Sequence, residues 1–138
     1  MASTLTSGTN GGAAYVMSRL FGGSPVSQIT TYYLVVFVGT PPTDDTISNE
    51  CTDGTYTRKA LAISGLTITG NVATNTADII WDAAFTGSVT VLDVGLATLS
   101  TGGYLHCVKA TTGGSVVVGA GDIFKIPAGD LSINIPTL

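Results

Sequence analysis

The chain has 138 residues, which suits one domain rather than two. Only 10% of its residues are charged, against about 25% in an average soluble domain, which indicates either a sparsely charged monomer or, as we prefer, a surface largely covered by partners. The net charge is −4, the five basic residues are scattered, and the longest apolar run spans only residues 32–38, so neither nucleic-acid binding nor a bilayer crossing is expected.

The first 28 residues form a predicted segment of their own. Residues 1–11 carry no charge and almost no large apolar group, so they cannot bury enough surface to offset the entropy of ordering, and we expect a mobile arm. Over residues 12–21, small and apolar side chains recur at helical spacing on one face. They are Ala13, Ala14, Met17, Leu20 and Phe21. A short helix is therefore predicted here, and the glycines at 22 and 23 end it.

From residue 29 onward the pattern is that of β-strands. Residues 29–39 are rich in β-branched and aromatic side chains and are apolar on both alternating faces, as in a central strand that is covered on both sides. A segment with two prolines and several acidic residues follows up to Gly54, and we expect it to be an exposed loop. The further expected strands lie within 55–64, 66–70, 76–82, 89–100, 104–110, 115–121 and 122–138.

Turns separate these strands, and their positions indicate the fold class. Turn chemistry is found at 101–103, 112–114 and 127–130. Within 89–100, strict alternation places one set of side chains on the core face. They are Thr90, Leu92, Val94, Leu96 and Thr98. Short strands at regular spacing predict a mainly β chain, with a single β-sandwich or jelly-roll-like domain over residues 29–138.

The residue types that carry chemistry in enzymes form no recognisable constellation. His106 is the single histidine, and its strand neighbour Cys107 is expected to point to the opposite sheet face, so a partly buried, hydrogen-bonded histidine is favoured over a catalytic one. Asp78 and Asp82 would lie on one strand face about 13 Å apart, too far to share acid–base work. We therefore expect no enzyme activity, no cofactor and no small-molecule substrate.

Some residues leave alternatives open. No signal peptide is visible, so two free thiols at Cys51 and Cys107 in a reducing compartment are favoured over a disulfide. Acidic residues gather between 44 and 53, where a solvated loop is favoured over a calcium site. They are Asp44, Asp45, Glu50 and Asp53. Trp81 is assigned to the core or to a subunit interface. Arg58 is a candidate partner for a carboxylate that the sequence does not identify.

Six segments occur in an order that is typical of a known group of proteins. They are Leu20–Gly23, 31–44, Gly54–Arg58, 73–84, 90–107 and 118–135. In this order they resemble a widespread group of small structural proteins of tailed bacteriophages, often labelled phage tail fibre proteins. Some members of similar architecture serve as head decoration or cement proteins. This group usually has a longer central insertion and a different strand where this chain has Leu92–Val94, and residues 1–11 match no part of it.

The resemblance implies a place in the virion, with assembly in the cytoplasm of the host bacterium. Our leading hypothesis is a capsid decoration protein that binds across subunits of the major capsid protein and packs as a homo-oligomer, expected to be a closed trimer. The arm residues expected to bind the capsid are Thr4, Leu5, Thr6, Ser7, Thr9 and Asn10. The residues expected at an interface are Met17, Leu20, Phe21 and Trp81.

Three other hypotheses are kept beside it. A tail or tail-fibre-associated component would need a receptor-facing surface, for which the loop at 44–53 is the candidate. A carbohydrate-binding β-sandwich unrelated to virions would need exposed aromatic side chains, whereas most aromatics here lie within strand patterns. A hydrolase using His106 or Cys107 would need partner groups that the sequence does not place beside them.

Overall fold

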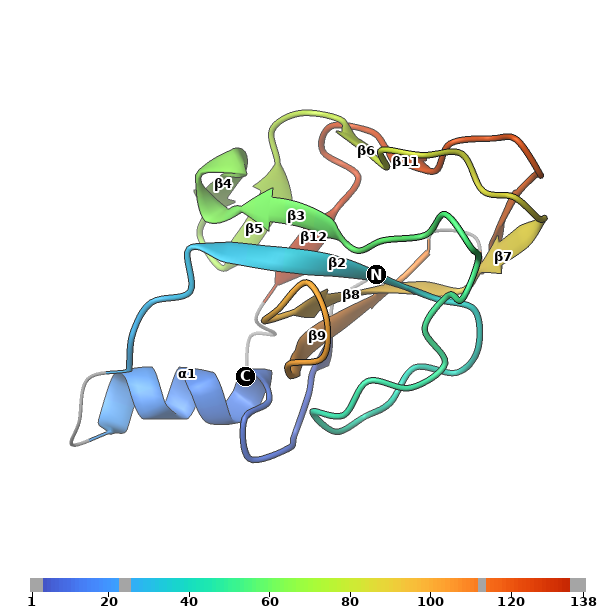
Figure 1. Ribbon diagram of the computed structural model, residues 1–138. Coiled ribbons are helices and arrows are strands. Elements are labelled where there is room, and N and C mark those ends of the chain that lie inside the picture. Colours follow the sequence, from blue (N-terminus) through green and yellow to red (C-terminus); the bar gives the residue numbers. More distant parts are fainter. Residues whose placement is uncertain (1–3, 23–25, 112–113, 135–138) are drawn as a thin grey trace.

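The computed structural model describes residues 4–22, 26–111 and 114–134 of the chain. Its largest element is a five-stranded antiparallel sheet with the strand order β1-β9-β8-β2-β3 (Figure 1). The strands are β1 (Thr4–Leu5), β2 (Thr31–Phe37), β3 (Lys59–Ala62), β8 (Asp93–Ala97) and β9 (Leu105–Ala110). β2 pairs with β3 on one side and β8 on the other, as expected of a strand with two apolar faces.

Smaller sheets and two helices complete the described part of the chain. The second sheet has the order β12-β5-β4, and two ribbons pair β10 with β7 and β11 with β6. Their strands are β4 (Leu66–Thr69), β5 (Val72–Asn75), β6 (Ile79–Ile80), β7 (Val89–Val91), β10 (Val116–Val118), β11 (Lys125–Ile126) and β12 (Ser132–Asn134). Helix α1 (Gly12–Phe21) precedes β2, and a 3-10 helix (Ile63–Gly65) joins β3 to β4. The predicted mainly β, sandwich-like fold is confirmed, as is the position of the helix.

The two faces of β2 contact separate apolar clusters. Leu34 and Val36 face the larger cluster. Its aromatic members are Trp81, Phe85 and Phe124. On the other face, Val35 and Phe37 pack against β8 and β9, and Ile47 packs on them from the loop that follows β2. These four β2 side chains are fully buried, and each contributes about 1.5–3 kcal/mol to folding. The loop after β2, expected to be an exposed excursion, therefore supplies part of the core.

The single strand expected over residues 89–100 is two strands with different partners. β7 pairs with β10, whereas β8 pairs with β2 and β9. Both valines of β7 are buried in the larger cluster and Thr90 is exposed, but in β8 the side chains that face this cluster are Val94 and Leu96, while Ala97 is buried in the smaller cluster on the other face. The side chains that face the larger cluster are therefore odd-numbered in β7 and even-numbered in β8. The change occurs at Leu92, which lies between the two strands. The predicted core face is right for β8 and wrong for β7, because alternation holds only within an uninterrupted strand.

Two of the predicted turns are present. Gly102 and Gly103 connect β8 to β9 with φ of 63° and 75°, the left-handed region that a side chain rarely adopts. In the turn at 127–130, Gly129 has φ 84° and the Asp130 N–H donates to the Pro127 carbonyl at 3.1 Å. The turn expected at 112–114 falls partly on residues 112 and 113, which lie outside the described residues.

A polar cluster of Glu50, Tyr56 and Arg58, which we call the Glu50 cluster, connects the loop after β2 to the β8–β9 hairpin. Arg58 donates from Nε and Nη2 to the two carboxylate oxygens of Glu50 at 2.8 and 2.7 Å. Its Nη1 donates to the carbonyls of Leu99 and Gly102 at 2.9 and 2.6 Å. The Tyr56 hydroxyl donates to the same carboxylate at 3.0 Å, and burial raises the pKa of this phenol, so it stays protonated. Glu50 is thus the partner of Arg58 that the sequence left open.

Candidate interaction surface

From residue 4 onward, the N-terminal segment is folded onto the domain. β1 pairs with β9, and the buried Thr6 donates its N–H to the His106 carbonyl at 3.1 Å. The Thr6 hydroxyl donates to the Leu105 carbonyl and accepts the Gly12 N–H, at 3.0 Å, at the start of α1. The prediction of a mobile arm is therefore wrong for residues 4–11. Hydrogen bonds to a distant strand order a segment whose composition lacks apolar surface to bury.

The residues expected to bind the capsid differ in their access to a partner. Leu5 is half-buried and packs against the larger core cluster, and Thr6 is fully enclosed. The accessible ones are Thr4, Ser7, Thr9 and Asn10. Residues 1–3 of the predicted arm lie outside the described residues. Any contact through this segment would use a folded surface rather than a free chain.

His106 is buried beside two tyrosines. The Tyr32 hydroxyl lies 3.1 Å from Nδ1, and the Tyr15 ring centre lies 5.0 Å from the imidazole. Burial lowers the pKa of His106 below its usual value and raises the pKa of the Cys107 thiol to about 12. Both groups are therefore uncharged at neutral pH and do not form the thiolate–imidazolium pair of cysteine hydrolases. The prediction of a buried, hydrogen-bonded histidine is confirmed, and Cys107 and Cys51 are free thiols.

The four acidic residues between 44 and 53 serve separate structural roles. Their hydrogen-bond partners are Thr46 for Asp44, Asn10 for Asp45, Arg58 and Tyr56 for Glu50, and Thr55, Thr86 and Gly87 for Asp53. Within the described ranges, no group of three or more His, Cys, Asp or Glu side chains is placed to hold a metal ion. Each carboxylate fixes a loop instead of meeting the others, so the calcium alternative has no geometry to support it.

Acid should destabilise the fold through these carboxylates. Backbone N–H groups, first that of Thr86, lower the pKa of Asp53, and Lys125 lowers the pKa of Asp78. The pKa of each of these carboxyls is lower in the fold than the unfolded value of about 3.9. The contribution of the ionised carboxylate to the free energy of unfolding is therefore complete above about pH 4, and it is lost as the pH falls through the folded pKa. We expect the Tm to fall slightly as the pH drops below about 6.5, because the unfolded chain then protonates His106 while the fold keeps it neutral, and to fall further below about pH 4 through the carboxylates, as measured by circular dichroism.

The Asp53→Asn variant tests this assignment. It should melt at a lower temperature than the wild type at pH 7, and the difference should shrink as the pH falls below 4. Asp82→Asn, whose carboxylate binds Lys59 on the surface, is the matched control and should retain the wild-type acid profile. A wild-type profile for Asp53→Asn as well would show that Asp53 contributes nothing to acid lability.

Asp78 and Asp82 belong to separate ion pairs. Asp78 accepts from Lys125 Nζ and from the Ala128 N–H, both at 2.9 Å. Asp82 accepts from Lys59 Nζ at 2.6 Å. As the strand spacing predicted, the two carboxylates do not share a site. Asp78 binds the first residue of β11, and Asp82 binds the first residue of β3.

Of the four residues expected at an interface, three are exposed and one is buried. Trp81 is only 3% exposed and packs against the Phe124 ring with centres 4.8 Å apart, so it belongs to the core and not to a subunit interface. Met17, Leu20 and Phe21 are 56%, 67% and 75% exposed. We refer to these three side chains as the helix knob. Apolar side chains gathered at one exposed place are typical of an interaction surface.

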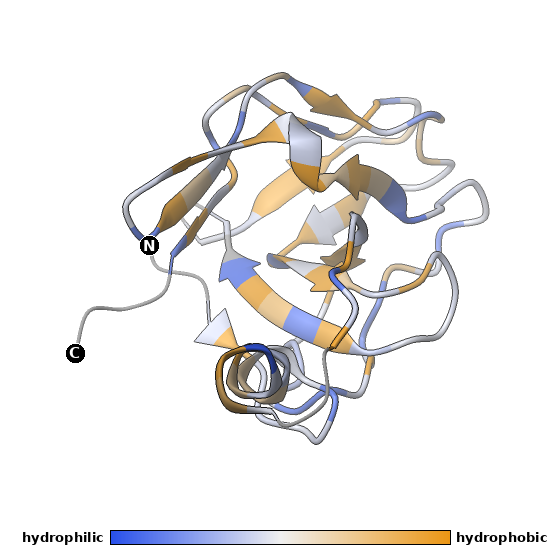
Figure 2. Cartoon of the chain, turned by 90° about the vertical axis from the view of Figure 1, so that its left-hand side faces the viewer, coloured by the Kyte–Doolittle hydropathy of each residue, from blue (hydrophilic) through white to orange (hydrophobic). Residues whose placement is uncertain are grey.

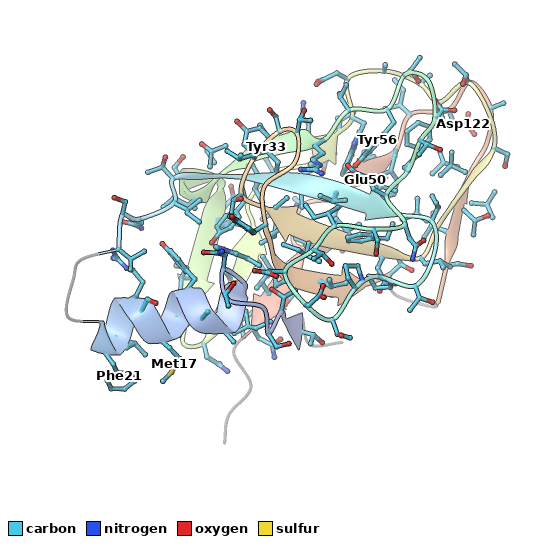
Figure 3. All side chains as sticks on the ribbon, turned by 60° about the horizontal axis from the view of Figure 1, so that its bottom comes forward. Met17, Phe21, Tyr33, Glu50, Tyr56 and Asp122 are labelled. Atoms are coloured by element: carbon cyan, nitrogen blue, oxygen red, sulfur yellow. The ribbon has the colours of Figure 1, made fainter. Side chains whose placement is uncertain are left out.

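The helix knob protrudes because only the first half of α1 is docked. Gly12 is buried against β9, the next four residues are half-buried, and every residue from Met17 to Phe21 is exposed. Figure 1 shows the helix extending past the sheet, and in Figure 3 Met17 and Phe21 point away from the domain. Figure 2 looks along the helix and shows hydrophobic residues on its outer side. The sequence pattern located this apolar face but not its exposure.

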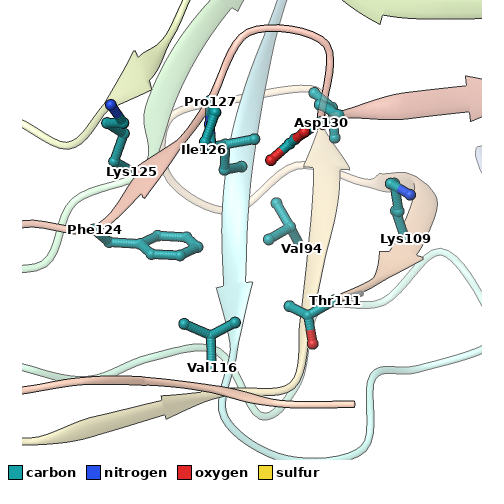
Figure 4. Close-up of a pocket in the computed structure, with 10 residues that line it drawn as sticks. Val94, Lys109, Thr111, Val116, Phe124, Lys125, Ile126, Pro127 and Asp130 are labelled. Atoms are coloured by element: carbon teal, nitrogen blue, oxygen red, sulfur yellow. The ribbon is translucent and has the colours of Figure 1, made fainter. Parts of the chain in front are cut away.

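A pocket of about 200 Å³ opens elsewhere on the domain (Figure 4). Its floor is apolar and buried. The floor residues are Val94, Phe124, Ile126 and Leu131. Val116 and Asp130 lie at its exposed mouth, and Figure 4 shows the Asp130 carboxylate pointing inward. We call it the β11 pocket. It joins side chains from several strands that are distant in sequence, so no local pattern could have indicated it.

The sequence model of one protein family matches almost the whole chain. The family is described as podophage GP4 fiber I protein gp80, and the match covers residues 9–134. The chain belongs to this family. No curated protein matches the sequence significantly. The resemblance to phage fibre-type proteins that the six segments indicated is thereby confirmed. As a member of the gp80 family, the chain is a structural protein of a tailed bacteriophage.

Two of the six segments that carry the resemblance supply residues to features described above. The segment Gly54–Arg58 supplies two members of the Glu50 cluster, and 118–135 supplies most of the floor of the β11 pocket. Among the described segments, no helix has the length and hydrophobicity that a bilayer crossing requires. Membership of a podophage fiber protein family argues against the hypothesis of a carbohydrate-binding module unrelated to virions.

Proposed function

We propose that this gp80-family chain is a non-enzymatic structural subunit of a podophage tail fibre, assembled from several copies of itself. The observation that carries the proposal is the match of residues 9–134 to a family described as a fiber I protein. A structural subunit needs surface for partners, and the sparse charge of the chain together with the exposed helix knob fits that need. The neutral, buried His106 and Cys107 also suit a protein without catalysis.

A capsid decoration protein is the alternative, with the major capsid protein as partner and a closed trimer as the expected assembly. A mobile arm that orders on contact with the capsid would suit this role, and the order of residues 4–11 removes that argument. The observation that still favours it is the uncharged, accessible surface of this segment. That surface is formed by Thr4, Ser7, Thr9 and Asn10.

Copy number and position in the particle separate the two functions. Quantitative mass spectrometry of purified virions, scaled to the major capsid protein, should find a small number of copies, and these should fractionate with isolated tails. Abundance comparable to the capsid protein, with retention on tailless heads, would overturn the fibre proposal in favour of decoration. Absence from particles would overturn both.

A further inference from the structure

Residues 4–22 comprise β1, the loop after it and α1, and we call them the N-terminal unit. Several contacts between this unit and β9 are made by one residue, His106. The His106 carbonyl accepts the Thr6 N–H at 3.1 Å. Its imidazole packs against Tyr15 of α1, with ring centres 5.0 Å apart, and hydrogen-bonds to the backbone of Asn10. Both the main chain and the side chain of His106 therefore hold the N-terminal unit on the sheet.

The cover over the His106 ring comes from two parts of the fold, and together they leave the residue only 6% exposed. Tyr32 belongs to the central strand β2, and its hydroxyl lies 3.1 Å from Nδ1. Tyr15 and Asn10 belong to the N-terminal unit and line one cleft together with His106. If the N-terminal unit withdrew, the ring would gain access to water, whereas β9 would stay paired with β8.

A proton on the buried ring has little to balance its charge. Tyr15 and Tyr32 are phenols, which carry no charge at acidic pH. The acidic group that acts on the ring is Asp45, whose carboxylate accepts the Asn10 N–H at 2.8 Å. Burial lowers the pKa of His106 by more than the Asn10 hydrogen bond and Asp45 raise it. The fold therefore favours the neutral ring.

The other charged groups on the packed elements do not change this balance. Within the described residues, β1 and β2 carry no charged side chain, and α1 carries only Arg19. On β9, Lys109 lines the β11 pocket. Asp93 of β8 lies opposite Ala110, at the end of β9 that is farther from His106. The two cations would repel a protonated ring rather than stabilise it.

We propose that His106 is a pH-sensitive switch, in which protonation of the buried ring releases the N-terminal unit from β9 while the rest of the domain stays folded. In the released state the ring meets water, where a histidine has its ordinary pKa of about 6.5. Protons therefore bind the released state more tightly than the docked state, and the equilibrium shifts toward release as the pH falls below about 6.5. This switch is independent of the proposed function, because it depends only on contacts within one chain.

Release changes the surface that the domain presents. Departure of β1 uncovers the edge of β9, where Cys107 and Val108 pair with Leu5 and Thr4. Unpaired strand edges are templates for pairing with another chain. Acid would thus open a strand edge that the N-terminal unit covers at neutral pH.

Amide hydrogen exchange at about pH 7 and about pH 5, with the rates corrected for the intrinsic effect of pH, measures release. The opening constant of residues 4–22 should rise about 3-fold to 30-fold in acid, and that of β2 and β8 should not. The upper figure is the limit for a ring that is protonated only when released. His106→Gln keeps a hydrogen-bonding side chain that does not titrate, so its opening constant should not change between the two pH values. Asp45→Asn is the matched control and should retain the wild-type rise, which separates the effect of His106 from that of its acidic neighbour.

The reverse linkage gives a second measurement. His106 is the only histidine of the chain, so an NMR titration of the imidazole reports its pKa directly. This pKa should lie below its ordinary value in the wild type and move toward about 6.5 in Gly12→Ala, where a Cβ atom 1.9 Å from the His106 carbonyl oxygen forces the helix away. Gly54→Ala, where a Cβ atom meets nothing within 4 Å, should leave the pKa unchanged. This comparison decides the question if His106→Gln is already released at neutral pH.

Four results would overturn the switch. They are an equal acid response in His106→Gln, a lost response in Asp45→Asn, acid-accelerated exchange that is as large in β2 and β8 as in residues 4–22, and a wild-type His106 pKa at or above its ordinary value. A rise that is confined to residues 4–22 and absent from His106→Gln would establish it.

Discussion

Replacing Gly12 by Ala is expected to lower the free energy of unfolding by about 3 kcal/mol. A Cβ atom at this position would lie 1.9 Å from the His106 carbonyl oxygen and 3.0 Å from the Leu5 side chain. The carbonyl belongs to β9, which is held between β8 and β1, so the start of the helix has to withdraw. Withdrawal breaks the hydrogen bonds that Thr6 makes with Gly12 and with β9. The better helix propensity of Ala, about 1 kcal/mol, does not compensate for them.

Urea unfolding and amide hydrogen exchange measure this effect. The midpoint should fall, and exchange should accelerate most over residues 4–21, more than in β2 and β8. Gly54→Ala is the control, because a Cβ atom there meets nothing within 4 Å, and its stability should stay within about 0.5 kcal/mol of the wild type. Equal stability of the two variants would mean that the helix does not dock against β9 in solution.

Replacing Arg58 by Ala is expected to cost about 3 kcal/mol, because removing one partner of a largely buried ion pair strands the other. The side chains of Arg58 and Glu50 are 6% and 24% exposed. The truncation leaves the Glu50 carboxylate without its cation and removes the donor to the carbonyls of Leu99 and Gly102. Arg58→Lys should recover only part of the loss, because a single ammonium cannot reproduce the guanidinium fork.

The same unfolding experiment has a neighbouring control on the surface. Lys59 adjoins Arg58 in sequence and pairs with Asp82 at 2.6 Å, where the Asp82 side chain is 75% exposed. Lys59→Ala should therefore cost no more than about 1 kcal/mol. A loss for Arg58→Ala as small as that for Lys59→Ala would show that the Glu50 cluster does not hold the loop.

The sequence by itself determined the elements whose signals are local. Helical spacing placed α1 at residues 12–21, the run of β-branched and aromatic residues placed β2 with both faces buried, and the paired glycines at 102 and 103 placed a hairpin turn. The order of these segments along the chain also indicated the phage family. Each of these depends on residues close together in the sequence or on their order, so composition and periodicity were enough.

Only the tertiary structure decided the features that depend on distant residues. Thr6 is ordered by β9, about a hundred positions later, and no property of the first eleven residues could reveal that. The change of strand partner at Leu92 reversed the inward-facing set in β7. The helix knob is exposed and Trp81 is enclosed, although both read as apolar. Burial depends on which surfaces the whole chain brings together, and alternation or helical spacing only states which side chains share a face.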